Sequence, residues 1–132
     1  MRFAILNDYL GIGSDLIEIE RIRAAHKKHG ASFLDRLFSK REQAYCEKYQ
    51  DPIPRYAGRF AAKEAVVKAL GIGVNKWCEI EVINNEHGKP EVFLSADLKK
   101  QFPKKHLLVT ISHCQSYATA TALVIGEYTP LS

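Results

Sequence analysis

The stretch RFAAKEAVVKALGIG, residues 59–73, predicts a strong helix that carries a carboxylate on its apolar side. At about 100° per residue, Ala57, Phe60 and Val67 form an apolar stripe, and Glu64 falls within about 40° of its centre. A carboxylate that faces a core must be paired, protonated or bound to a ligand, because its desolvation is costly. The partner of Glu64 is therefore the question that this helix raises.

Length and composition limit the class of protein. The chain has 132 residues, the size of one domain, and 46% of them are hydrophobic, which is enough for a real core. We expect a single domain over residues 1–132, with residues 1–8 as an N-terminal extension of unassigned role. The net charge of +4 is mild. It suits an acidic protein or a phosphorylated ligand and does not by itself indicate nucleic acid.

The three cysteines, Cys46, Cys78 and Cys114, are widely spaced and form no CxxC pair. They indicate neither a zinc site nor a disulfide framework, and they favour a reducing cytoplasm. The apolar run at the N-terminus is interrupted by Asn7 and Asp8, so we expect no signal peptide. No apolar run approaches the roughly 18 residues that a membrane span needs.

The periodicity predicts helices first and hairpins later, which is typical of an α+β fold with a largely antiparallel sheet packed on a long central helix. Ser39 and Glu42 form a capping box, and Gly71 is placed to end the long helix. We expect helices over 16–30, 32–38, 40–49, 55–70 and 96–102, and strands over 9–15, 78–85, 90–94, 107–113 and 117–127.

Asp15 follows a Gly-x-Gly sequence at the expected end of the first strand. The glycines allow another backbone or a ligand to approach closely, so a carboxylate there is well placed as a metal ligand. Alternatively Asp15 caps the helix that follows, because aspartate is a preferred N-cap residue.

Glu64 has two alternative interpretations as well. It either forms a buried salt bridge, for instance with Lys68 one turn on, or shares a divalent cation with Asp15. The basic residues Arg59, Lys63 and Lys68 on the same helix favour the second interpretation. A diphosphate needs both a cation such as Mg²⁺ and basic groups to share its charge.

His113 ends an apolar row formed by Leu107, Val109 and Ile111, because side chains alternate along a strand. It is either a satisfied core residue or a group that binds phosphate or transfers a proton. The predicted first helix carries a basic face, which is either simply solvated or a docking surface for an acidic helix of a partner. Its members are Arg21, Arg23, Lys27 and Lys28.

Three motifs together resemble the holo-[acyl-carrier-protein] synthase family, the 4′-phosphopantetheinyl transferases of bacterial fatty-acid synthesis. They are GIGSDLIEIERI (11–22), AGRFAAKEAVVKALGIG (57–73) and ISHCQSYATA (111–120), and the intervening HGKP (87–90) is also similar to a family signature. Order and spacing match over nearly the whole chain from about Tyr9. The departures include Ile72, where threonine is frequent, and His87, where asparagine is frequent. Ala25 and Ser32 also depart, because other members carry more bulk or charge there.

The resemblance implies a phosphopantetheinyl-transferase fold and its reaction. The 4′-phosphopantetheine group would pass from coenzyme A to a serine of apo-acyl carrier protein, leaving adenosine 3′,5′-bisphosphate. It also implies Mg²⁺ as cofactor, with Mn²⁺ able to substitute, and a homotrimer with active sites shared between subunits. In such an assembly Asp15 and Glu64 could face different subunits' cleft walls. The implied partners are coenzyme A and acyl carrier protein, with no nucleic acid and no membrane.

The resemblance also implies roles for matching residues. Asp15 and Glu64 would bind the metal, and Lys68 and His113 would contact the diphosphate and complete the catalytic set. The matching residues that would line the coenzyme A cleft are Arg59, Lys63, Gly71, Gly73, Gly88, Lys89 and Pro90. Arg21 matches an arginine that grips the carrier, and we include Arg23 and Lys28 in the same docking face.

Two other classes compete with this interpretation. A non-catalytic module that binds acidic proteins would keep the basic helix but would not need Asp15, Glu64 and His113 together. A nucleic-acid binder predicts clustered arginines with exposed aromatic side chains, whereas Tyr56 and Phe60 fall on the apolar stripe.

Overall fold

The protein is described from a computed structural model, which describes residues 4–6, 10–126 and 128–130. The helices are α1 (Ile19–His29), α2 (Ala31–Leu37), α3 (Lys40–Cys46), α4 (Ile53–Leu70) and α5 (Ala96–Gln101), with a short 3₁₀ helix, η1 (Trp77–Glu79). The strands are β1 (Ala4–Leu6), β2 (Leu10–Glu18), β3 (Ile80–Asn84), β4 (Pro90–Leu94), β5 (Lys105–His113), β6 (Tyr117–Gly126) and β7 (Tyr128–Pro130). The expected α+β class and its antiparallel pairing are confirmed.

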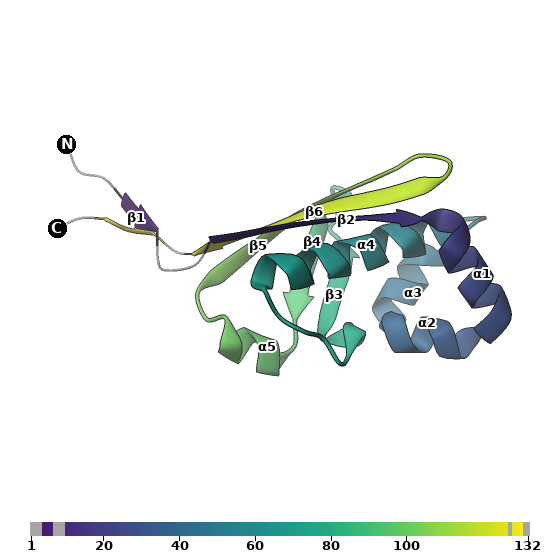
Figure 1. Ribbon diagram of the computed structural model, residues 1–132, viewed down its shortest axis with the longest axis horizontal. Helices are drawn as coiled ribbons and strands as arrows, with labels where there is room; N and C mark the ends of the chain where they lie inside the picture. Colours follow the sequence, from purple (N-terminus) through teal and green to yellow (C-terminus); the bar gives the residue numbers. More distant parts are fainter. Residues whose placement is uncertain (1–3, 7–9, 127, 131–132) are drawn as a thin grey trace.

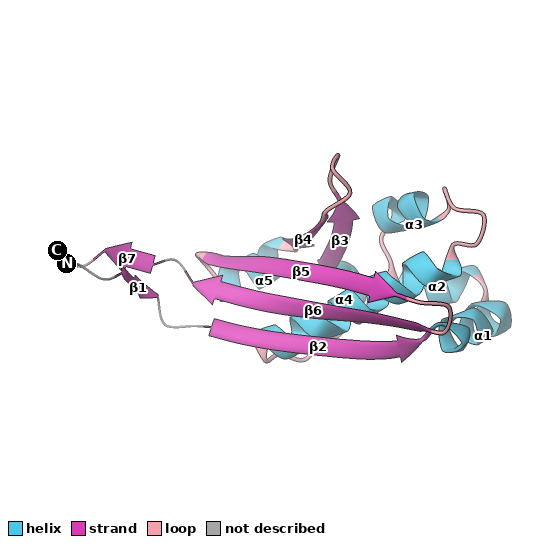
Figure 2. Cartoon of the chain, turned by 90° about the horizontal axis from the view of Figure 1, so that it is seen from above, coloured by secondary structure: helices cyan, strands magenta, loops and turns pink. Residues whose placement is uncertain are grey.

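The main layer is a three-stranded antiparallel sheet in the order β2-β6-β5, and α4 lies along one face of it (Figures 1 and 2). Small side chains allow the helix to come close. Ala118, Ala120 and Ala122 of β6 face α4 and are buried. A Cβ atom on Gly13 would lie 2.1 Å from the carbonyl oxygen of Ala65, so only glycine fits there.

Two groups of elements flank α4 at its two ends (Figure 1). Helices α1, α2 and α3 lie at its N-terminal end, over a core that includes Phe38 and Tyr56, whose rings are 4.8 Å apart. The β3-β4 hairpin and α5 lie towards its C-terminal end, where Ile80 and Val82 are fully buried. Strands β1 and β7 form a separate antiparallel pair beyond the end of the sheet (Figure 2).

The first strand is longer than the sequence predicts. Strand β2 pairs with β6 as far as Glu18, and α1 begins only at Ile19. The predicted helix start at Leu16 is therefore wrong, because pairing along the full length of β6 outweighs the helical periodicity. Asp15 consequently lies inside a strand and is not an N-cap. The predicted strand start at Tyr9 lies outside the described residues.

Several local signals are confirmed. The capping box of Ser39 and Glu42 is present in both directions. Gly71 ends α4 in the left-handed conformation, with φ 70°, and Ser95 accepts a hydrogen bond from the backbone of α5. Helix α4 begins at Ile53, slightly before the expected start, because proline is tolerated in a first helical turn.

The sheet face opposite α4 is apolar and exposed. Leu10, Ile12 and Leu16 of β2 are 62%, 72% and 66% exposed, and Leu108 of β5 is 46% exposed. Ile12 and Leu108 both pair in register with Leu123 of β6, so their side chains share one face. We call Leu10, Ile12, Leu16 and Leu108 the outer apolar face. A contiguous patch of this kind is typical of an interaction surface.

Candidate active site

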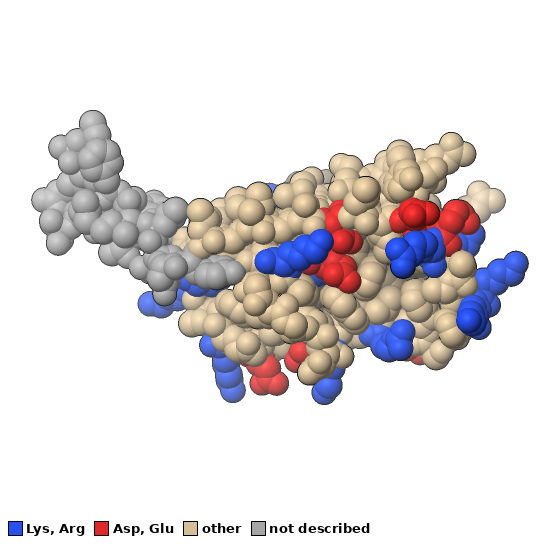
Figure 3. Space-filling model, in the orientation of Figure 1, with Lys and Arg blue, Asp and Glu red and all other residues tan. Residues whose placement is uncertain are grey.

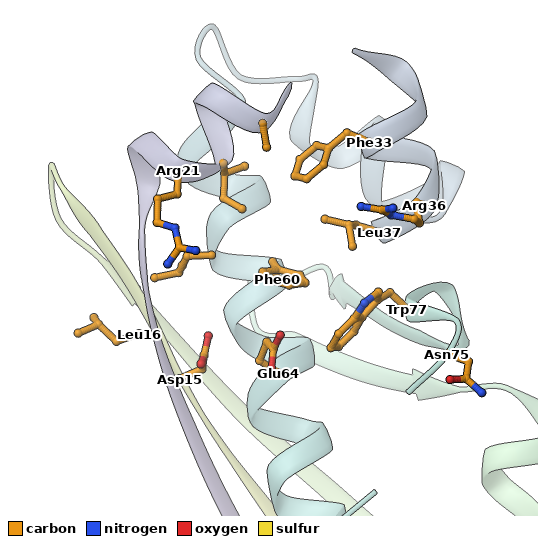
Figure 4. A pocket seen from close by; sticks show the side chains of 13 residues that line it. Asp15, Leu16, Arg21, Phe33, Arg36, Leu37, Phe60, Glu64, Asn75 and Trp77 are labelled. Atoms are coloured by element: carbon orange, nitrogen blue, oxygen red, sulfur yellow. The ribbon is translucent and has the colours of Figure 1, made fainter. Parts of the chain in front are cut away.

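A cavity of about 550 Å³ opens where β2, α1, α2, α4 and the segment before β3 meet (Figure 4). Asp15 and Glu64 enter it side by side from β2 and α4. Its other side is largely apolar and includes Phe33, Leu37 and Phe60. The cavity therefore combines a pair of carboxylates with an apolar wall.

Asp15 is held in place by helix α4 and strand β6. Its side chain is 18% exposed, and its Oδ1 lies 3.3 Å from the Nζ of Lys68. The same ammonium donates to the Ser14 carbonyl at 2.9 Å, and the Thr119 hydroxyl donates to the Asp15 carbonyl at 2.8 Å. Strand β6 and helix α4 thus both orient this carboxylate.

Glu64 is half-buried, and no described side chain pairs with it. The predicted salt bridge from Lys68 goes to Asp15 instead. Burial, and then the negative charge of Asp15, raise the pKa of Glu64, while Lys68 acts in the opposite direction. Two carboxylates that repel each other in a shared cavity are suited to a divalent cation.

The donor set fits Mg²⁺ in composition. Within residues 4–6, 10–126 and 128–130, no cluster of three or more His, Cys, Asp or Glu side chains is arranged to hold a metal. Mg²⁺ commonly takes only one or two carboxylates and completes its octahedron with waters and phosphate oxygens. Asp15 and Glu64 could supply the two carboxylates.

The helical wheel misplaced the buried face of α4. The fully buried face includes Ala61, Ala65 and Ala69, whereas Phe60 and Glu64 lie at its edge and open into the cavity. Alanine is weakly apolar in such an analysis, so its close packing against the small residues of β6 was underestimated. Glu64 is thus a cavity residue and not a core residue.

Two predicted cleft residues are buried on another side of α4. Lys63 is fully buried and paired with Glu42 at 2.7 Å, so it does not line the cavity with Asp15. Arg59 is 3% exposed, lies 4.0 Å from the centre of the Tyr45 ring and donates to the side chain of Asn84. The expectation that both surround Glu64 is wrong, because residues 59 and 63 point to a different side of the helix.

His113 is also remote from the carboxylates in this chain. It is exposed at the end of β5, which excludes the core interpretation, and it does share the face of Leu107, Val109 and Ile111. Its Nε2 lies 3.1 Å from the guanidinium of Arg55. It lines a separate hollow with Cys114. Strand β6 lies between β5, which carries His113, and β2, which carries Asp15.

The three expected docking residues differ in their surroundings. Arg21 is exposed and lines the cavity, and Lys28 is exposed further along α1. Arg23 instead donates to both carboxylate oxygens of Asp51, at 3.1 and 2.8 Å, and to Glu20. These bonds raise the pKa of Arg23 and tie α1 to the loop before α4. Arg23 is thus engaged by its own chain and less available to a partner than Arg21, and its assignment to the docking face stays a prediction.

The glycine-containing loops lie outside the cavity. Gly71 and Gly73 follow α4, and a Cβ atom on Gly73 would meet nothing within 4 Å. Gly88 turns the β3-β4 hairpin with φ 81°. The next residues, Lys89 and Pro90, line a hollow between β4 and β5.

Sequence reasoning missed most of the cavity wall, including Arg36 of α2, Asn75 and Trp77. Arg36 and Arg21 approach the cavity from α2 and α1 (Figure 4). Neither Asn75 nor Trp77 belongs to a periodic pattern, and only the fold brings them to the cavity. On the face drawn in Figure 3, acidic side chains gather over the middle of β2 and α4, with basic side chains beside them.

Comparison with known proteins places this geometry in a family. The family model described as the 4′-phosphopantetheinyl transferase superfamily matches residues 11–122. The chain belongs to this superfamily. It is 53% identical to the holo-[acyl-carrier-protein] synthase of Protochlamydia amoebophila over 117 residues, which is 86% of this chain and 96% of that protein. It is 47% identical to the Chlamydia pneumoniae synthase, over 90% of this chain and 99% of that protein.

Solved structures of holo-[acyl-carrier-protein] synthases share the fold of this superfamily member. The Helicobacter pylori enzyme in complex with coenzyme A matches with a TM-score of 0.79 and 32% identity, over 86% of this chain and 98% of that one. The Bacillus anthracis enzyme, also in complex with coenzyme A, matches with a TM-score of 0.76 and 30% identity, over 95% of this chain and 100% of that one. The resemblance predicted from the three motifs is confirmed.

Proposed function

We propose that this protein is a holo-[acyl-carrier-protein] synthase that transfers 4′-phosphopantetheine from coenzyme A to a serine of apo-acyl carrier protein. The serine oxygen bonds to the phosphorus that carries pantetheine, and the bond from that phosphorus to the bridging oxygen breaks. Adenosine 3′,5′-bisphosphate leaves with that oxygen. The observation that carries the proposal is the Asp15, Glu64 and Lys68 constellation beside an apolar-walled cavity.

Asp15 and Glu64 would hold Mg²⁺ in this proposal. A bound Mg²⁺ supplies charge neutralisation for the diphosphate oxygens. Lys68 contacts Asp15 and is 53% exposed, so with a cation bound beside Asp15 its ammonium would be free to turn to a phosphate oxygen. It contributes a second positive charge beside the breaking bond.

The serine must lose its proton as it attacks. Glu64 enters the cavity and has a raised pKa, so it is one acceptor for this proton, and a cavity water is the other. The apolar wall of Phe33, Leu37 and Phe60 excludes bulk water and suits the pantetheine arm or apolar side chains of a carrier.

The site is shared between subunits of a homotrimer in this proposal. Two observations support it. His113 and the Gly88–Pro90 hairpin turn lie on surfaces away from the Asp15 and Glu64 cavity of their own chain. The outer apolar face needs a cover. A neighbouring copy on that face could bring its His113 to the diphosphate. Asp15 and Glu64 come from the same chain, so the sharing does not divide the metal ligands.

Acyl carrier protein is the second substrate, and Arg21 and Lys28 form its docking face. Carrier proteins of this kind are acidic, and exposed basic groups speed such encounters. Fatty-acid biosynthesis in the cytoplasm is the setting we propose, in keeping with three free cysteines. Among the described residues, no helix combines the length and hydrophobicity needed to cross a bilayer.

Mass spectrometry of apo-acyl carrier protein tests the reaction. The carrier is incubated with this protein and coenzyme A, with Mg²⁺ or with a chelator. We expect the mass of one phosphopantetheine to be added only when Mg²⁺ is present. An unmodified carrier under all conditions would contradict the proposed function, and modification in the presence of chelator would contradict the metal requirement.

A further inference from the structure

Lys63 is the most deeply buried charged side chain of α4, and the proposed chemistry does not use it. Its ammonium is fully enclosed and meets three oxygens. The Leu37 carbonyl is at 2.6 Å, Glu42 Oε1 at 2.7 Å and the Trp77 carbonyl at 3.1 Å. A lysine ammonium has three N–H donors, so each is satisfied.

Glu42 completes the same network. It is also fully buried, and its Oε1 accepts the Ser39 amide at 2.9 Å in addition to Lys63. Its Oε2 accepts the Val82 amide at 2.8 Å. The pair thereby joins the end of α2, the start of α3, helix α4, η1 and strand β3 at one point.

The network is connected to the active-site cavity through its carbonyl contacts. Leu37 and Trp77 both line the cavity that holds Asp15 and Glu64. Lys63 directly precedes Glu64 in α4. The same turn of the helix therefore presents the Glu64 carboxylate to the cavity and, through Lys63, binds the Leu37 and Trp77 carbonyls of the facing wall. The Trp77 ring also packs edge-on against Phe60, with 5.2 Å between centroids.

Stability alone does not account for the pair. Burying two charges has a desolvation penalty that often equals the attraction between them, and apolar replacements are frequently neutral or stabilising. What such a pair adds is geometry, because short charge-assisted hydrogen bonds define the positions of the groups they join. Here those groups are two backbone carbonyls of the cavity wall.

We infer that Lys63 is a positioning residue, whose buried ammonium sets the distance between the Leu37–Trp77 wall and the Asp15–Glu64 carboxylates. The inference rests on the proposed function for its effect on the reaction. Its geometric part stands independently. Without this ammonium the wall relaxes, and the serine and the pantetheine arm meet the carboxylates in a less productive arrangement.

The test uses Lys63→Met and the double variant Lys63→Met with Glu42→Gln. Met matches the length of the lysine stem, and Glu42→Gln removes the unpaired charge while keeping an acceptor for one of the two backbone amides, Ser39 and Val82, that Glu42 binds. The double variant is therefore designed to fold even where Lys63→Met alone does not. Lys99→Met is the matched control, because Lys99 is exposed on α5 far from the cavity.

Two readouts separate positioning from mere stability. Trp77 is the only tryptophan of the chain, so its fluorescence reports the wall directly. We expect the double variant to unfold cooperatively at a higher temperature than Lys63→Met, because it holds no unpaired buried charge, yet to show red-shifted emission and greater acrylamide quenching than the wild type. We expect its kcat to fall about 10- to 100-fold, with the KM for coenzyme A changed by less than about threefold, since small displacements in an active site are costly to the rate.

Each outcome has a distinct meaning. Wild-type Trp77 emission and kcat in a folded double variant would overturn the inference, because the pair would then be only structural. The inference would also be overturned if the double variant regained kcat relative to Lys63→Met in proportion to its gain in unfolding temperature. An inactive wild-type protein would contradict the proposed function instead, while the Trp77 emission of the variants would still decide whether Lys63 sets the wall.

Discussion

At the residue scale, the two carboxylates of the cavity differ in whether a basic side chain contacts them. Lys68 reaches Asp15 and not Glu64, so Asp15 has a partner, while Glu64 has a raised pKa and no partner among the described side chains. The pattern Lys-Glu-x-x-x-Lys indicated that basic groups lie nearby, but not which carboxylate they would contact. The carboxylate that Lys68 contacts depends on how β2 is aligned along α4, and sequence spacing does not encode that alignment.

Cys46 allows a residue-scale prediction about pH. Burial raises the pKa of its thiol from 9.0 to about 12. Below pH 9 both folded and unfolded thiols are protonated, so the stabilising contribution is complete; above it the unfolded thiol ionises first and the contribution is lost. We expect the free energy of unfolding to fall by about 1.4 kcal/mol per pH unit from this group between these values.

Urea unfolding across that range measures the effect. Cys46→Ala should show a shallower decline with pH than the wild type, whatever its stability at pH 7. The comparison of slopes removes the contributions of tyrosines and of the other cysteines, which both proteins share. Identical slopes would show that the Cys46 thiol ionises equally easily in the folded and unfolded chains.

At the element scale, the approach of β2 to α4 brings Asp15 and Glu64 together. Gly13 lies two residues before Asp15 and allows the strand to touch the backbone of the helix. The Gly-x-Gly sequence correctly indicated a close approach. The approaching group is the backbone of helix α4, since a Cβ atom on Gly13 would meet Ala65 and Ala69.

Gly13→Ala tests this contact. Its Cβ atom would fall 2.1 Å from the Ala65 carbonyl oxygen and 2.7 Å from the Ala69 amide nitrogen, so strand and helix must separate. We expect a loss of about 3 kcal/mol in the free energy of unfolding, or failure to fold. Gly73→Ala is the control, since its Cβ would meet no atom within 4 Å, and it should change stability by less than about 0.5 kcal/mol.

Helix α1 gives a second prediction at this scale, because its two arginines differ in their partners. Arg21 is exposed at the cavity, whereas Arg23 is held by Asp51 and Glu20. Arg21→Ala should raise the KM for acyl carrier protein about tenfold and leave the KM for coenzyme A nearly unchanged. Arg23→Ala should change neither by more than about twofold. Equal effects on the two carrier KM values would contradict the distinction.

At the scale of the whole molecule, element types were more predictable from sequence than side-chain positions. The capping box, the β3-β4 hairpin and the end of α4 at Gly71 depend on nearby residues, and all were predicted. Lys63 was misassigned because its partner Glu42 and the Trp77 carbonyl come from elsewhere in the chain. His113 could not be placed relative to Asp15 from the sequence, because their positions depend on the strand order. The structure places their strands, β5 and β2, at opposite edges of the sheet.

The outer apolar face leads to a prediction about assembly. Ile12 is 72% exposed in the single chain, so Ile12→Glu should not disturb its fold. If the face is covered by neighbouring subunits, the same change buries a charge in the interface. We expect sedimentation velocity to give a trimer for the wild type and a monomer with little transferase activity for the variant. A fully active Ile12→Glu monomer would contradict a shared site.

The central claim is that Asp15 and Glu64 together hold the Mg²⁺ that the transfer requires. The most direct measurement is the initial rate of transfer from coenzyme A to acyl carrier protein as a function of Mg²⁺ concentration, for the wild type and for Glu64→Gln. We predict saturation with Mg²⁺ in the wild type, and in the variant a rate at least about 100-fold lower, with weakened Mg²⁺ dependence. Normal turnover with an unchanged Mg²⁺ dependence in Glu64→Gln would contradict the account.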